Sequence, residues 1–78
     1  MQERFRSKYQ LLGIKIAYYR KRKGYTQEQF AELLDKSWSF VSQIEANNGK
    51  KIKGISLDTL FTISEVLDVP VAKFFIYD

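Results

Sequence analysis

The chain has 78 residues, 45% of them hydrophobic, which suits one small folded domain over residues 1–78 and argues against disorder. It contains neither Cys nor His, so thiolate chemistry is excluded and zinc sites and acid/base catalysis lose their commonest ligand and base. We therefore expect no cofactor, no metal and no enzymatic activity. The net charge of +4 is compatible with an anionic partner, and the absence of an apolar run near ~20 residues or of a signal peptide predicts a cytoplasmic protein with no membrane partner.

Apolar residues recur at helical spacing along most of the chain, and strand patterns are nearly absent. The first helix is predicted from Ser7 to Lys23, where Gly24 ends it as a left-handed residue. Gly13 is assigned, like the other glycines, to caps and turns. The second helix is predicted over residues 27–34 and the third over residues 38–46.

The starts of three helices are marked by hydroxyl residues that can accept a hydrogen bond from the first helical turn. Thr26 and Gln29 form a capping-box pattern before the second helix. Ser37 caps the third helix and Ser56 caps the fourth, and a short apolar fifth helix follows over residues 71–75. These elements predict an all-α, compact five-helix bundle, and the short spacing of the second and third helices predicts a helix-turn-helix over about residues 27–46.

The third predicted helix has two chemically different faces when its residues are placed at intervals of about 100°. Phe40, Val41 and Ile44 form an apolar arc, with Glu45 at its edge, and this arc is expected to anchor the helix in the core. The opposite arc carries an indole, two hydroxyls, a methyl and a primary amide, from Trp38, Ser39, Ser42, Ala46 and Gln43. An uncharged surface arc is unusual in a chain that is 28% charged.

The uncharged arc has the chemistry needed to read base edges in the major groove. Gln43 can bond adenine through two hydrogen bonds, and Ser39 and Ser42 can donate or accept. Trp38 has two interpretations at this stage, because it can lie against sugars and base methyls or fold back over the turn as packing. We predict Gln43, Ser39 and Ser42 as base contacts.

Phosphate contacts are predicted on both sides of that arc. The second helix begins at Gln27, where unpaired N–H groups favour a phosphate, and Gln27 can bond the same phosphate and brace Gln43. Charges are segregated along the chain, and residues 47–55 hold three lysines and no acid. We predict phosphate contacts from these lysines and from one in the turn before the third helix, namely Lys36, Lys50, Lys51 and Lys53.

Three segments together resemble the Cro/repressor (Xre-type) helix-turn-helix family: "RKRKGYTQEQFAELL", "SFVSQIE" and "SLDTLFTISEVLDV". The resemblance covers about residues 11–75. It implies a lambda-repressor-like DNA-binding domain in which double-stranded DNA is the partner. It also implies that Gln27 touches phosphate and that Arg20 and Glu45 bridge the first and third helices. The base-facing places that it implies are those of Trp38, Ser39, Ser42 and Gln43.

Physical reasoning is consistent with the implied pair, because a partly buried carboxylate needs a partner and arginine supplies a planar fork. The alternative for Arg20 is a phosphate contact within a basic run. The chain departs from the family at Asp35, where Gly is common, and at Ala46–Asn47, where Asn-Gly is usual.

The C-terminal segment is too apolar for the end of a small monomer. Phe74 is expected to enter the core, and Phe75, Ile76 and Tyr77 are predicted to form a dimer interface, unless all four seal the core. The preferred interpretation is a sequence-specific transcriptional regulator that binds a palindromic operator as a homodimer. The alternative is a protein-interaction module, or a DNA-binding antitoxin whose main partner is a toxin or other protein.

Overall fold

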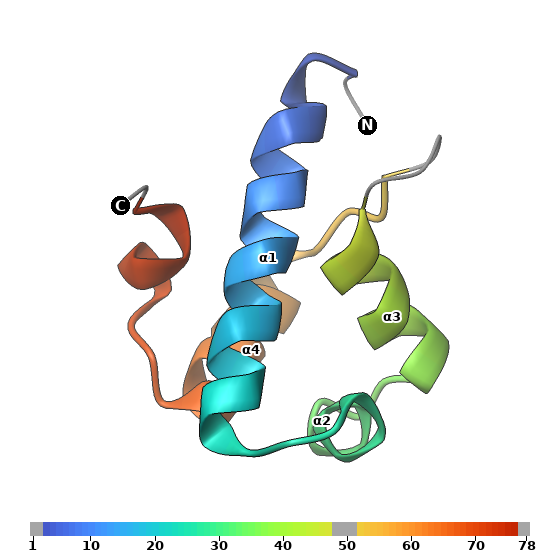
Figure 1. Ribbon diagram of the computed structural model, residues 1–78, viewed down its shortest axis with the longest axis vertical. Coiled ribbons are helices and arrows are strands. Elements are labelled where there is room, and N and C mark those ends of the chain that lie inside the picture. Colours follow the sequence, from blue (N-terminus) through green and yellow to red (C-terminus); the bar gives the residue numbers. More distant parts are fainter. Residues whose placement is uncertain (1–2, 48–51, 77–78) are drawn as a thin grey trace.

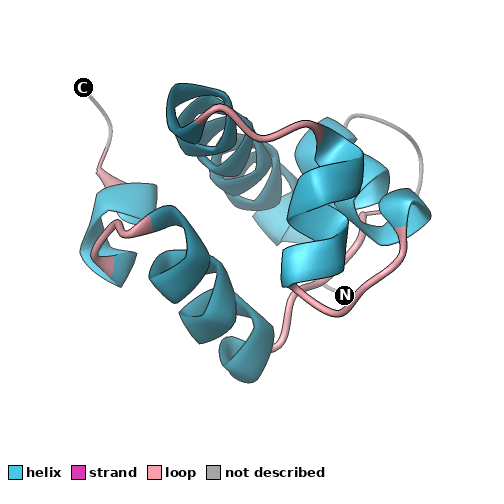
Figure 2. Cartoon of the chain, turned by 90° about the horizontal axis from the view of Figure 1, so that it is seen from below, coloured by secondary structure: helices cyan, strands magenta, loops and turns pink. Residues whose placement is uncertain are grey.

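The computed structural model describes residues 3–47 and 52–76 and places most of them in helices joined by short loops (Figures 1 and 2). Lys50, Lys51 and Tyr77 lie outside the described residues. The part of the chain that is described contains no strand, so the all-α prediction is confirmed. The elements are η1 (Glu3–Phe5), α1 (Arg6–Lys23), α2 (Gln27–Leu33), α3 (Trp38–Ala46), α4 (Leu57–Leu67) and η2 (Val71–Phe75). The predicted fifth helix is present as the 3-10 helix η2.

The helix starts follow the predicted capping chemistry. Thr26 Oγ1 accepts a hydrogen bond from the Gln29 backbone N–H at 3.1 Å, and Gln29 Oε1 accepts one from the Thr26 N–H at 2.9 Å. Ser37 and Ser56 cap α3 and α4 by accepting from the backbone N–H three residues on. Each bond satisfies a donor that has no partner inside its helix, so local sequence fixes where these helices begin.

The core lies along α1, which contacts α3, α4 and η2, while α2 packs against α3. Figure 1 shows α1 between α3 on one side and η2 on the other. The core side chains come from every α-helix and from η2: Leu12, Ile16, Phe30, Ala31, Leu34, Val41, Ile44, Leu60, Ile63, Leu67 and Phe74. Leu57, which opens α4, is instead 67% exposed.

Gly13 lies inside α1 rather than at a cap or turn, so that assignment was wrong. It is buried where α1 crosses α3, and a Cβ at this position would clash with the backbone carbonyl of Ile44. The missing side chain lets the two helix backbones approach closely. Because of this close crossing, the end of α3 that carries Glu45 lies directly against α1.

The turns before and after α3 use left-handed backbone conformations. Asp35, where the resembling family often has glycine, has φ 57°, and Asn47, directly after α3, has φ 35°. Asp and Asn enter this region more readily than other non-glycine residues. The chain can therefore make both turns without glycine, and α2 and α3 form the helix-turn-helix pair.

Candidate nucleic-acid interface

The two faces of α3 differ sharply in burial. Val41 and Ile44 are fully buried against the core, and Phe40 is partly buried beside them. On the opposite face, three side chains are exposed and one is half-buried. We call this face the polar stripe; it consists of Trp38, Ser39, Ser42 and Gln43. The apolar side of α3 therefore anchors the helix and leaves the polar stripe directed away from the core.

An ion pair fixes α3 against α1. Arg20 Nε lies 2.7 Å from Glu45 Oε2, and Arg20 Nη2 donates to Glu45 Oε1 at 3.0 Å. Arg20 Nη1 also donates to the backbone carbonyl of Tyr25 at 2.7 Å. The side chains of the pair are only 8% and 6% exposed, so the two groups are largely desolvated and depend on each other. Arg20 therefore bonds to Glu45 and to the loop before α2.

A chain of hydrogen bonds continues from this ion pair to the surface. Gln27 Nε2 donates to Glu45 Oε1 at 3.0 Å, and Gln27 Oε1 accepts from Trp38 Nε1 at 3.1 Å. A carboxylate only accepts and an indole N–H only donates, so each neighbour requires the same orientation of the Gln27 amide. Trp38 is bonded back to α2, and 53% of its surface stays exposed.

The expected contact between Gln27 and Gln43 is not formed. Gln27 spans Glu45 and Trp38, and Gln43 Nε2 donates to Ser39 Oγ at 3.3 Å, one turn earlier on α3. The prediction was wrong because residues 38 and 45 are seven apart and so lie on one side of α3, which is the side that faces Gln27. Gln43 lies farther around the helix.

Two lysines approach the edge of α3 that carries Phe40. Lys36 Nζ lies 5.3 Å from the centroid of the Phe40 ring, and Lys53 Nζ lies 5.4 Å from it. Both lysines are exposed and within the range of a cation–π contact. One comes from the turn before α3 and the other from the segment after it, so the fold brings both positive charges to the Phe40 side of α3.

Asn47 is a structural residue that the sequence reasoning missed. It is 3% exposed, and its Oδ1 accepts a hydrogen bond from the Lys53 backbone N–H at 2.8 Å. Its Nδ2 lies 3.4 Å from the Lys53 carbonyl and 3.5 Å from that of Tyr9. The available signal was an asparagine directly after the last helical residue, a position that favours a left-handed conformation. Asn47 holds Lys53 close to the end of α3.

A second group of exposed side chains is apolar and lies on α4 and at the end of the chain. Phe74 is buried as predicted, whereas Phe75 and Ile76 are 52% and 47% exposed. Leu57 and Phe75 line the same hollow of about 200 Å³, and Phe61 follows Leu57 by one helical turn and is 51% exposed. We call Leu57, Phe61, Phe75 and Ile76 the apolar patch.

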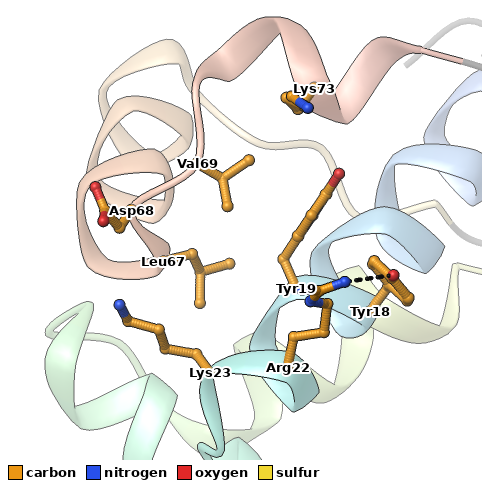
Figure 3. Close-up of a pocket in the computed structure, with 8 residues that line it drawn as sticks. All are labelled: Tyr18, Tyr19, Arg22, Lys23, Leu67, Asp68, Val69 and Lys73. Carbon is orange, nitrogen blue, oxygen red and sulfur yellow. Dashed lines mark hydrogen bonds between the residues drawn. The ribbon is translucent and has the colours of Figure 1, made fainter.

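A hollow of about 420 Å³ lies away from the polar stripe, between the ends of α1 and α4 and η2 (Figure 3). Its lining residues, none from α2 or α3, are Tyr18, Tyr19, Arg22, Lys23, Leu67, Asp68, Val69 and Lys73. Arg22 Nη1 donates to Tyr18 Oη at 3.0 Å, and this hydrogen bond raises the pKa of Arg22 above its ordinary value.

Among the described residues no helix is long and apolar enough to cross a bilayer, and no cluster of acidic side chains offers a metal site.

Comparison with known proteins gives a consistent result for the fold. A family model described as helix-turn-helix matches residues 16–74. The restriction-modification controller protein C.AhdI from Aeromonas hydrophila superposes with a TM-score of 0.78 at 23% identity, over 88% of this chain and 98% of that chain. The clp gene regulator ClgR from C. glutamicum superposes with a TM-score of 0.73 at 26% identity, over 85% of this chain and 80% of that chain. A sequence search of curated proteins found no match.

Proposed function

Because the chain belongs to the helix-turn-helix family of DNA-binding transcriptional regulators, of the Xre type, we propose that it binds a palindromic operator as a homodimer. In this proposal α3 enters the major groove and its polar stripe reads the bases. The observation that carries the proposal is the burial pattern of α3, in which Val41 and Ile44 are fully buried while the polar stripe is free to meet a partner. The two structural neighbours are named as a controller and a gene regulator, which supports the same class of function.

The hydrogen-bonding groups left on the polar stripe match a base edge. Gln43 gives one amide hydrogen to Ser39 and keeps its other N–H and its carbonyl oxygen available. These two groups can pair with N7 and N6 of adenine. The bond to Ser39 restrains the Gln43 side chain before DNA arrives, which lowers the entropy lost on binding. We therefore assign Gln43 the central base contact and Ser39 and Ser42 neighbouring ones.

Backbone phosphates would be held at both edges of α3. Gln27 has one amide hydrogen left after it bonds Glu45, and it lies in the first turn of α2, where the helix N-terminus favours an anion. Lys36 and Lys53 lie at the other edge. We assign Lys50 and Lys51 to phosphate contacts at this edge as well, from their places in the sequence. Contacts of this kind set the register of the protein on the duplex, while the polar stripe selects the sequence.

The apolar patch supports assembly as a dimer. Leu57 and Phe75 line one hollow, Phe61 follows Leu57 by one helical turn, and Ile76 follows Phe75 in the chain; all four are exposed, and exposed apolar side chains that gather in this way are typical of an interface. We propose that two copies bury this patch against each other and that Tyr77 contributes to the same contact. A two-fold dimer would present two α3 helices to half-sites about 34–36 Å apart.

Selection of bound duplexes from a random library tests the proposal directly. We expect a palindrome whose half-sites are centred about one helical turn apart, and affinity that falls steeply between roughly 50 and 200 mM salt. Recovery of duplexes without a common sequence, together with a salt-independent interaction, would reject the proposed function. Recovery of a single non-repeated site would retain α3 as the reader and reject the dimer.

A further inference from the structure

Trp38 is the first residue of α3 and the largest side chain of the polar stripe, with 53% of its surface exposed. An indole has one hydrogen-bond donor and no acceptor. That donor, Nε1–H, is directed to Gln27 Oε1 at 3.1 Å. The ring therefore meets a partner with apolar atoms only, although it stands among side chains that offer polar groups.

The bond between Trp38 and Gln27 is held from the protein side. Glu45 accepts from Arg20 and from Gln27, and because it can only accept, it requires the NH₂ end of the Gln27 amide. The carbonyl end must then face the indole. If Trp38 turned its N–H toward a base, the Gln27 carbonyl would lose its partner while the amide stayed fixed by the ion pair. The indole N–H is thus retained by a network that reaches the nearly buried Arg20.

We infer that Trp38 reads DNA through the apolar edge of its ring, and that the feature it selects is the 5-methyl group of a thymine in the major groove. This inference rests on the proposed function. The methyl group is the apolar feature that base edges present in that groove, whereas the other features are donors or acceptors that a ring without a free donor cannot satisfy. Trp38 then sets specificity at one position of each half-site, and Gln43 sets it at another.

The experiment replaces each thymine of the selected operator by deoxyuridine, one position per half-site at a time. This change removes the methyl group and leaves the hydrogen-bonding groups in place. We expect binding to weaken about three- to fivefold per half-site at one thymine position, the factor that corresponds to burying one methyl group. In Trp38→Ala the same replacement should have no effect at that position. Trp38→Phe keeps an apolar ring without the N–H and should retain the preference for thymine.

Gln43→Ala serves as the matched control, since it removes a neighbouring stripe residue and should leave the thymine-to-uridine ratio at the Trp38 position unchanged. Because Trp38 is half exposed, its variants are expected to fold, and thermal unfolding checks this. An operator in which no thymine responds to deoxyuridine, or a response that survives in Trp38→Ala, overturns the inference while the proposed function stands. Failure to recover any operator rejects the proposed function itself, and the inference with it.

Discussion

Trp38 and Phe75 expose nearly the same fraction of their surface, 53% and 52%, but the protein supports them in different ways. Trp38 is bonded through Gln27 to the ion pair of Arg20 and Glu45, so its orientation is set by groups in the interior. Phe75 has no polar atom in its side chain and lies beside an apolar hollow. Two side chains with equal exposed fractions therefore belong to surfaces of different kinds, one held by hydrogen bonds and one without them.

The difference follows from what each surface is proposed to bind. Base edges offer donors and acceptors in fixed directions, so side chains that read them gain from being held in place. A second copy of an apolar patch requires area and shape, and the energy of burial has no direction. The polar stripe is restrained by hydrogen bonds, and the apolar patch is not. The two surfaces should therefore respond to different substitutions.

The largest expected effect comes from Glu45→Ala, which removes the support of the polar stripe. Arg20 would keep a nearly buried charge without its carboxylate, and Gln27 would lose the acceptor that fixes its amide. We expect the free energy of unfolding to fall by about 3–5 kcal/mol. Urea denaturation measures this change. Glu28→Ala removes an exposed carboxylate from α2 and is the matched control, with an expected change within about 0.5 kcal/mol. Equal stability of the two variants would show that the ion pair does not support α3.

The next effect concerns the apolar patch. Phe75→Ser should weaken the dimer at least about tenfold, because burying the exposed half of one phenylalanine contributes about 0.8–1.5 kcal/mol and a two-fold dimer buries two of them. Sedimentation equilibrium measures the shift toward monomer. Ile14→Ser is the control, since Ile14 is 59% exposed on α1 and lies outside the patch. Dissociation caused by Ile14→Ser and not by Phe75→Ser would move the dimer contact to α1.

A smaller effect is expected for Gln43→Ala, which changes the polar stripe without touching its support. Specific binding should weaken by about 1–3 kcal/mol with a loss of preference at one base pair. Affinity for a random duplex, stability and dimerisation should stay unchanged, because Gln43 is exposed and its bond to Ser39 is local. Titration against operator and random duplexes separates these terms. An equal loss on both duplexes would mean that Gln43 does not read bases.

The helix ends could be predicted from the sequence because their chemistry is local. Thr26, Ser37 and Ser56 bond backbone groups three residues away, so the pattern and the contact are visible together. Gly13 could not be understood in this way, because its role depends on the carbonyl of Ile44, which lies 31 positions along the chain. A glycine inside a helical pattern is compatible with a turn or with a close crossing until the partner helix is known.

In the candidate site, too, contacts between different helices could not be predicted from the sequence. The polar stripe was visible as an uncharged arc on one predicted helix, since all four of its residues belong to α3. The bonds that hold Trp38 involve three elements, and the position of Gln27 between Trp38 and Glu45 depends on how α2 crosses α3. Sequence periodicity gives the faces of each helix separately. It does not give the angle at which two helices meet, so the partner of Gln27 was assigned to the wrong side of α3.

The smallest expected effect is on the salt dependence of DNA binding. Comparing two lysines at different places tests whether the position of a positive charge matters or only the net charge. Lys53 lies beside Phe40 at the edge of the polar stripe, whereas Lys73 is equally cationic and exposed but lines the hollow on the other side of α1. Lys53→Ala should lower the log–log salt slope of DNA binding by about 0.9 for each protomer on the duplex, because each phosphate that is neutralised releases counterions. Lys73→Ala removes the same charge and should leave the slope unchanged. Equal slopes for both variants would mean that net charge attracts the duplex without a fixed phosphate contact at Lys53.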